Sequence, residues 1–169
     1  MRFIRPLLVA SALMLTACAS LGGLTRVVQP PHFEEAVGQP AEFRLLGPSR
    51  TMPVGGAGIR LWLKITNPNG FGFTLSTVRA TLELEGTRAA DGDFPLGLPL
   101  TARGQSVVPL DLTVSFADLP GLAGTLRKLA VGGRVPYDLN GTVGVDAGRL
   151  GTPTFGPMLL TRGEMRVVR

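Results

Sequence analysis

The sequence is poor in the residues that build disulfide frameworks, metal centres and most catalytic sites. Its 169 residues include one cysteine and one histidine. A disulfide framework needs paired cysteines, and a structural zinc site needs several cysteine or histidine ligands. Both classes are therefore excluded, and we expect neither a metal nor a cofactor.

Charge is also scarce, at 17% of the residues against a norm of about 25%. Together with 44% hydrophobic residues, this excludes a solvated, disordered chain. The 23 glycines and 14 prolines predict many turns. The net charge of +5 comes from scattered cations, without the basic and aromatic clusters that bind single-stranded nucleic acid. Nucleic acid is therefore not an expected partner.

No catalytic constellation can be assembled from the sequence. His32 is the only imidazole, and no G-x-S-x-G elbow accompanies it. The glycine-rich stretch 55–58 lacks the Lys and Ser/Thr of a phosphate-binding loop. Asp91 and Asp93 are not followed by a twelve-residue calcium loop with its terminal Glu, so Asp91-Gly92 is expected to form a solvated turn. We therefore expect no catalytic residues and no enzyme activity.

The N-terminal apolar run, Leu7–Leu15, is too short to cross a bilayer as a helix, which takes about 20 residues. It follows two arginines and has the length of the apolar region of a secretory signal. The next residues complete Leu15-Thr16-Ala17-Cys18, which resembles the lipobox of bacterial lipoproteins. We expect residues 1–17 to be a signal peptide and Cys18 to be lipidated. The alternative is an ordinary thiol that follows a signal peptide.

Lipidation of Cys18 implies an exported protein whose partner is a membrane. Residues 18–27 would be the tether, which extends to at most about 33–36 Å, and residues 28–169 the domain. The residue after the cysteine is Ala19, which resembles outer-membrane rather than inner-membrane lipoproteins. We therefore expect a lipid anchor in the cell envelope, with the outer membrane favoured.

Alternation of apolar and polar residues predicts a mainly β domain. The strongest segments are 59–66, 78–85, 110–116 and 135–145, and weaker ones are 41–47, 94–98 and 158–167. Turn residues separate these segments, which is typical of an antiparallel sandwich or barrel. One segment differs, because leucines at 119, 122, 126 and 129 form one stripe of a helix over 119–131. This helix either caps an open end of the β structure or lies on a membrane surface.

Residues 59–86 contain a strand that ends in Asn67-Pro68-Asn69 and a second strand that ends in Gly86. This arrangement resembles the group-two late embryogenesis abundant family, whose module is also called the WHy domain. The strand 107–116, the helix and the segment Tyr137–Gly141 extend the resemblance over roughly residues 36–147. It implies a fibronectin type III-like or immunoglobulin-like β-sandwich of about seven strands with one short α-helix. It also implies a non-catalytic role in desiccation and other water stress.

The Asn-Pro-Asn segment has two interpretations. Pro68 cannot donate to a strand ladder, and asparagine side chains close turns on nearby backbone, so the segment builds the end of a strand. Alternatively, exposed Asn67 and Asn69 belong to a contact surface.

The sequence leaves two functions to compare, and a third, an adaptor in an envelope complex, cannot be separated from them by sequence. The first is a membrane-anchored protein that shields stressed client proteins or lipid through weak surface contacts. The alternative is an envelope lipoprotein that binds a lipid or hydrophobic ligand between its strands. Trp62, on the face opposite the apolar stripe of 59–65, suggests a second covered surface.

Overall fold

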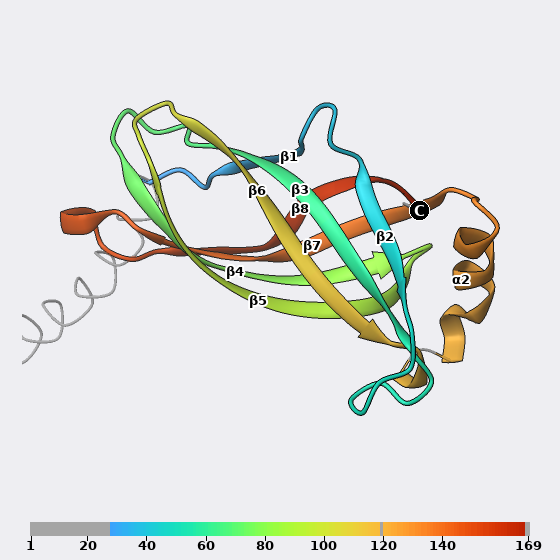
Figure 1. Ribbon diagram of the computed structural model, residues 1–169. Helices are drawn as coiled ribbons and strands as arrows, with labels where there is room; N and C mark the ends of the chain where they lie inside the picture. Colours follow the sequence, from blue (N-terminus) through green and yellow to red (C-terminus); the bar gives the residue numbers. More distant parts are fainter. Residues whose placement is uncertain (1–27, 119, 168–169) are drawn as a thin grey trace, which may run out of the picture.

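The computed structural model describes residues 28–118 and 120–167, and its architecture is mainly β (Figure 1). The strands are β1 (His32–Glu35), β2 (Ala41–Leu46), β3 (Gly56–Thr66), β4 (Phe73–Leu84), β5 (Thr87–Leu100), β6 (Gln105–Ser115), β7 (Val135–Asp146) and β8 (Thr154–Val167). The α-helix α2 spans Ala123–Ala130, and short 3-10 helices cover Phe116–Asp118, Pro120–Leu122 and Gly148–Leu150. The predicted β class with one short helix is confirmed.

These eight strands hydrogen-bond into one open sheet in the order β1-β3-β2-β8-β7-β4-β5, and β6 pairs with β3. Strands β1 and β2 pair with successive stretches of β3, and β6 runs along its whole length. The β2–β8 pair is parallel, whereas the other pairs are antiparallel. This parallel pair joins strands β1, β2, β3 and β6 to strands β4, β5, β7 and β8 in one sheet. A fibronectin-like sandwich of two separate antiparallel sheets is therefore not confirmed.

The predicted alternation along β3 is confirmed by burial. Ile59, Leu61, Leu63 and Ile65 are each at most 2% exposed. They belong to one buried cluster that also contains inward side chains of β4, β6, β7 and β8, so the sheet curves over a single core. Full burial of each such side chain stabilises the fold by about 1.5–3 kcal/mol.

Prolines lie on both open edges of the described sheet. Phe116 N donates to Gly55 O (3.2 Å) and Asn67 N donates to Gly104 O (2.9 Å), at the two ends of the β3–β6 ladder. Residues that bond to a neighbouring strand alternate along an antiparallel pair. Because the bonds at both ends involve residues 104 and 116, the even-numbered residues of β6 bond to β3, and the nitrogen of Pro109 points away from β3. The ladder therefore loses no donor, and the free edge is protected from pairing with another strand. The other edge, β5, carries Pro95 and Pro99.

The turn predicted at Asp91-Gly92 is wrong, because β5 continues through it and extends well beyond the short strand predicted at 94–98. Both aspartates find cross-strand partners on β4. The Thr81 hydroxyl donates to Asp91 (2.7 Å), and Arg79 Nε lies 3.2 Å from Asp93. Because Asp91 and Asp93 both have partners on β4, the chain stays extended at a position where the sequence favours a turn.

Helix α2 lies at one end of the sheet (Figure 1), as the end-capping interpretation predicts. Leu122 and Leu129 are at most 1% exposed, whereas Leu119 lies outside the described residues. Thr125 Oγ1 donates to Glu85 Oε2 (2.7 Å) and Lys128 pairs with the same carboxylate (2.5 Å). These bonds attach the helix to the β4–β5 turn. Within the described part of the chain, no helix is long and apolar enough to cross a bilayer.

Candidate functional site

The Asn-Pro-Asn segment lies in the loop between β3 and β4, at the end of the sheet opposite α2 (Figure 1). Asn67 is 0% exposed and Asn69 is 4% exposed, while Pro68 is half-buried. Burial of two amide side chains demands hydrogen-bond partners, because an unpaired buried polar group is costly.

Every polar atom of the Asn67 side chain is bonded. Its Nδ2 donates to the carbonyl oxygens of Phe71 (2.8 Å) and Thr101 (2.9 Å). Its Oδ1 accepts from Asn69 N (2.9 Å) and Asn69 Nδ2 (3.0 Å). The first of these bonds closes an Asx turn across Pro68. A single side chain thereby joins the β3–β4 loop to the turn between β5 and β6.

Asn69 attaches the start of the described chain to the same loop. Gln29 N donates to Asn69 Oδ1 (2.8 Å), and Asn69 Nδ2 donates back to Gln29 O (2.9 Å). Its carbonyl oxygen accepts from Arg103 N (3.1 Å) in the β5–β6 turn. The segment thus connects three parts of the chain that are distant in sequence.

The exposed contact surface that was one interpretation of Asn67 and Asn69 is wrong, because both side chains are buried and bonded within the protein. The bonds fit the alternative, in which the segment builds the end of a strand. Sequence reasoning missed Gln29, Thr101 and Arg103 as its partners, since no local pattern links residues so far apart. Cys18 and the predicted signal peptide lie outside the described residues, so they stay predictions.

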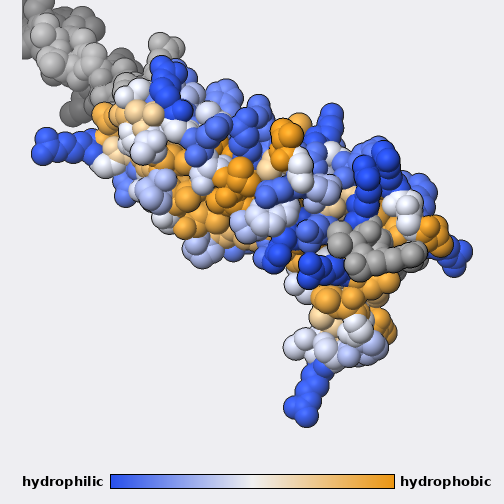
Figure 2. Space-filling view, turned by 45° about the horizontal axis from the view of Figure 1, so that its top comes forward, coloured by the Kyte–Doolittle hydropathy of each residue, from blue (hydrophilic) through white to orange (hydrophobic). Residues whose placement is uncertain are grey.

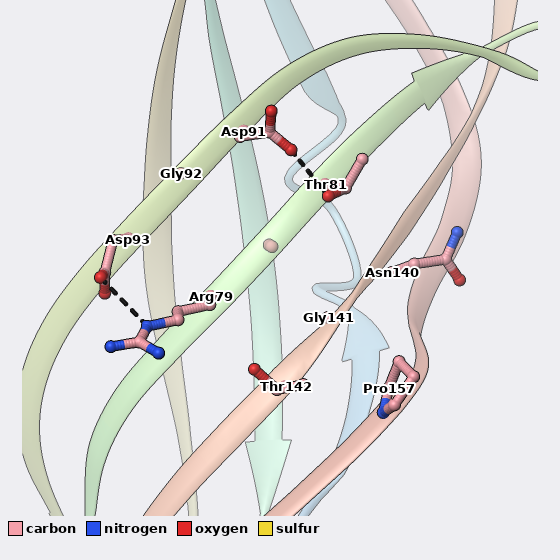
Figure 3. Close-up of a pocket in the computed structure, with 10 residues that line it drawn as sticks. Arg79, Thr81, Asp91, Gly92, Asp93, Asn140, Gly141, Thr142 and Pro157 are labelled. Atoms are coloured by element: carbon pink, nitrogen blue, oxygen red, sulfur yellow. Dashed lines mark hydrogen bonds and ion pairs between the residues drawn. The ribbon is translucent and has the colours of Figure 1, made fainter.

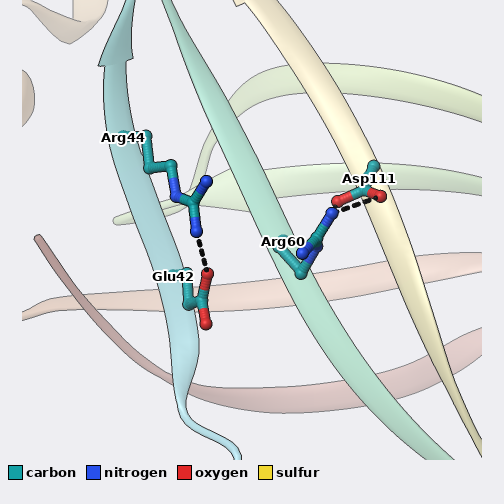
Figure 4. A network of polar contacts seen from close by, with 4 residues as sticks. All are labelled: Glu42, Arg44, Arg60 and Asp111. Carbon is teal, nitrogen blue, oxygen red and sulfur yellow. Dashed lines mark hydrogen bonds and ion pairs between the residues drawn. The ribbon is translucent and has the colours of Figure 1, made fainter. Parts of the chain in front are cut away.

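Ion pairs cover the outer faces of the strands. Among the described residues, eight acidic residues pair with eight cations within 4 Å, and two of these pairs are shown in Figure 4. Arg60 contacts Asp111 through two nitrogen atoms, and its hydrogen bonds and charge hold the pKa of Asp111 below the usual value. Arg60 also lies 5.9 Å from the centre of the Trp62 ring, so it covers part of this half-buried side chain. The pairs are Glu42–Arg44, Arg60–Asp111, Lys64–Glu34, Arg79–Asp93, Arg88–Asp91, Lys128–Glu85, Arg134–Glu164 and Arg162–Asp138.

A shallow hollow of ≈ 470 Å³ lies on the outer face where β5, β4 and β7 adjoin (Figure 3). Its polar side chains bond to one another, as in the Arg79–Asp93 and Thr81–Asp91 contacts. The Asp91 carboxylate that accepts from Thr81 is also paired with Arg88, and the described residues contain no cluster of three potential metal ligands. Three small residues adjoin across the strands beneath it: Gly92, Ala80 and Gly141.

Tyr137 begins the segment of β7 that resembles the family, and it makes a pH-dependent contribution to stability. Burial raises the pKa of Tyr137 to about 12, and the nearby Glu35 carboxylate adds to this shift. An unfolded tyrosine ionises near pH 10. The folded state therefore retains the proton more tightly, and the resulting stability is present below about pH 10 and is lost as the pH rises through about 12.

Because the chain has a single tyrosine, ultraviolet difference absorbance of the folded protein reads this group alone. We expect an ionisation midpoint near pH 12. The Tyr137→Phe variant should lose stability less steeply above pH 10 than the parent protein. A midpoint near pH 10 in the folded protein would contradict the buried environment.

Comparison with known proteins identifies the family. A family model described as Late embryogenesis abundant protein matches residues 63–158, which is more than half of the chain. No curated protein sequence gives a significant match.

Similar solved structures support the fold alone, because their sequence identities are low. An Arabidopsis thaliana protein has a TM-score of 0.53 and 17% identity, with 85% of this chain and 82% of that chain covered. A candidate late embryogenesis abundant protein has a TM-score of 0.52 and 16% identity, with 92% and 83% covered. These neighbours support the fold, and the family match over more than half of its length shows that the chain belongs to the late embryogenesis abundant protein family of group two.

Proposed function

We propose that this protein is a non-enzymatic, membrane-anchored protein that protects proteins or membranes during drying and related water stress. The observation that carries the proposal is the family match over residues 63–158, which fits a stress-related protein. Protection would come from weak and broad surface contacts of a packed domain.

The paired charges of the outer faces suit a protein that works as water is withdrawn. Attraction between opposite charges grows as the surrounding dielectric falls, whereas an isolated charge becomes costly. With eight described ion pairs on its surface, the domain satisfies much of its own charge. It would therefore retain its fold on drying and contact partners without a strong preference for one of them.

The anchor follows from the lipobox-like residues 15–18. Acyl chains on Cys18 would hold the protein at the cell envelope, because two or three chains make membrane attachment stable. The outer membrane is the favoured location. Intact-mass measurement of the protein purified from membranes tests this step, with Cys18→Ala as its control. The added mass of acyl chains is expected on the parent protein and not on the variant, and an unmodified parent protein would contradict the anchor.

A drying assay tests the protective role itself. A labile enzyme is dried and rehydrated with this protein, or with an equal mass of an inert protein of similar size. We expect a larger recovered enzyme activity with this protein, over a range of mass ratios. Equal recovery in the two samples at every ratio would overturn the proposed function.

The alternative, a lipid- or ligand-binding lipoprotein, needs an apolar cavity between the inner faces. Side chains such as Phe43, Leu61 and Leu139 are fully buried there and fill this space. The hollow of ≈ 470 Å³ lies instead on the outer face, and six of its ten lining residues are polar or charged. These observations favour the protective role, and native mass spectrometry that finds co-purified lipid inside the folded domain would reverse that preference.

A further inference from the structure

Among the described residues, the cations without an acid within 4 Å lie toward the two ends of the molecule. Six of the eight paired cations lie on strands, Lys128 lies on α2 and Arg134 lies directly before β7. Arg103 and Arg149, in contrast, have no acid within 4 Å in the part of the chain that the structure describes. Arg103 lies in the β5–β6 turn and Arg149 in the 3-10 helix between β7 and β8, and both are exposed. Figure 1 shows these two connections at the same end of the sheet. We call this end, formed by residues 67–72, 101–104 and 146–153, the entry end.

The entry end is also where the described chain begins. Asn69 bonds Gln29 through both of its side-chain polar atoms and bonds Arg103 through its carbonyl oxygen. The start of the described chain and the turn that carries Arg103 are thus held in one hydrogen-bonded network. Arg103 itself has a φ of +56°, a left-handed conformation that non-glycine residues adopt infrequently. The network holds this backbone in place and leaves the Arg103 side chain in solvent.

We propose that the entry end is a docking surface for anionic phospholipid headgroups, with Arg103 and Arg149 placed against the lipid phosphates. This inference rests on the proposed lipid anchor at Cys18. The tether from Cys18 to residue 27 has ten residues, a length that extends to at most about 33–36 Å, so the entry end cannot move far from the bilayer. Within the entry end, Asp146 is the single acid, and its carboxylate accepts a hydrogen bond from Gly148 N (2.9 Å).

Because the protein would be anchored to the membrane, weak attraction between the entry end and the lipid is enough for docking. A tethered surface meets the membrane at a high effective concentration, and each arginine near an anionic leaflet favours contact about fivefold. Half-buried Phe71 and Leu150 lie in the same loops and add apolar contact at the headgroup level. Docking would therefore determine how the protein is oriented on the membrane, while the lipid anchor attaches it.

In this orientation the opposite end faces away from the lipid. That end carries α2 and the loop between β2 and β3, where Val54 is 59% exposed. Figure 2 shows a projection at the lower right on which hydrophobic and hydrophilic residues adjoin. An upright protein would present this end, and its long sides, to client proteins.

Hydrogen exchange of the full chain on vesicles tests the docking surface. The protein is reconstituted into phosphatidylcholine vesicles with and without phosphatidylglycerol, and exchange is followed by mass spectrometry. We expect slower exchange of residues 101–104 and 147–151 when phosphatidylglycerol is present, and no change in residues 47–55. High salt should remove the difference, because it screens exposed charges.

Charge-matched variants assign the effect to the entry end. Arg103→Gln with Arg149→Gln should lower the ratio of docked to undocked protein about 30-fold, while Arg50→Gln with Arg127→Gln, at the opposite end, should leave it unchanged. Equal melting temperatures exclude misfolding as the cause. Equal exchange in both vesicle types, or equal losses in both double variants, would overturn the docking surface.

A separate measurement shows whether the proposed lipid anchor is wrong. The intact mass of the purified protein shows whether Cys18 carries lipid. If it carries none, the single cysteine is coupled to a maleimide-bearing phospholipid, and the same exchange experiment is repeated on the coupled protein. The proposed anchor would then be wrong, while the docking surface would still be supported or overturned by its own result.

Discussion

Replacing Asn67 with alanine is expected to lower the free energy of unfolding by about 3 kcal/mol. The variant removes two donors and one acceptor from a fully buried position. The carbonyl oxygens of Phe71 and Thr101 and the Asn69 amides lose their partners, and each buried unpaired group costs about 1–3 kcal/mol. Urea unfolding followed by circular dichroism measures the change.

A second variant separates lost hydrogen bonds from lost volume. Asn67→Asp keeps the shape and the acceptor but replaces the Nδ2 group, with its two N–H donors, by one oxygen that faces the carbonyl oxygens of Phe71 and Thr101. It should therefore destabilise the protein at least as much. Asn140→Ala is the matched control, because Asn140 lies half-buried on the outer face of β7, and its effect should stay within about 0.5 kcal/mol. Equal effects of Asn67→Ala and Asn140→Ala would show that the Asn67 bonds do not stabilise the fold.

Replacing Gly141 with alanine is expected to destabilise the protein by about 3 kcal/mol, at the upper end of overpacking effects. A Cβ atom at this position would overlap the carbonyl oxygen of Arg79 and lie 3.1 Å from Leu160 Cδ1. Because the overlap involves the backbone of the neighbouring strand β4, a change of rotamer cannot relieve it. The β4–β7 pairing would have to shift, and the melting temperature measures that loss.

Gly58 supplies the control, since it is also a strand glycine. A Cβ atom there would lie 3.9 Å from Leu46 Cδ1, an ordinary contact distance. Gly58→Ala should therefore leave stability unchanged or raise it by about 0.5 kcal/mol, because alanine restricts the unfolded chain. If the two substitutions have equal effects, the close approach of β4 to Gly141 is not what requires glycine.

Local patterns predicted the elements that depend on local physics. Strict alternation identified β3, β4, β6 and β7, because one face of each is buried. The leucine stripe identified α2, and burial of Leu122 and Leu129 explains its spacing. In these segments the spacing of the apolar residues matches the repeat of the strand or helix, so it predicts the element directly.

Features that depend on distant partners could not be predicted. The short strand β1 shows little alternation and exists because it pairs with β3, and the parallel β2–β8 pair depends on three-dimensional position alone. Asn67 and Asn69 were placed correctly at a strand end, but their burial follows from Thr101 and Gln29. The same holds for the ion pairs, since strand register decides which opposite charges meet.

Survival of drying by a strain that lacks this protein tests the central claim most directly. The deletion strain is complemented with the parent chain or with Cys18→Ala, at equal protein levels, and viable cells are counted after drying and rehydration. An anchored protective protein predicts that deletion lowers survival, that the parent chain restores it and that Cys18→Ala restores it less. Equal survival of the deletion strain and its parent would contradict the account.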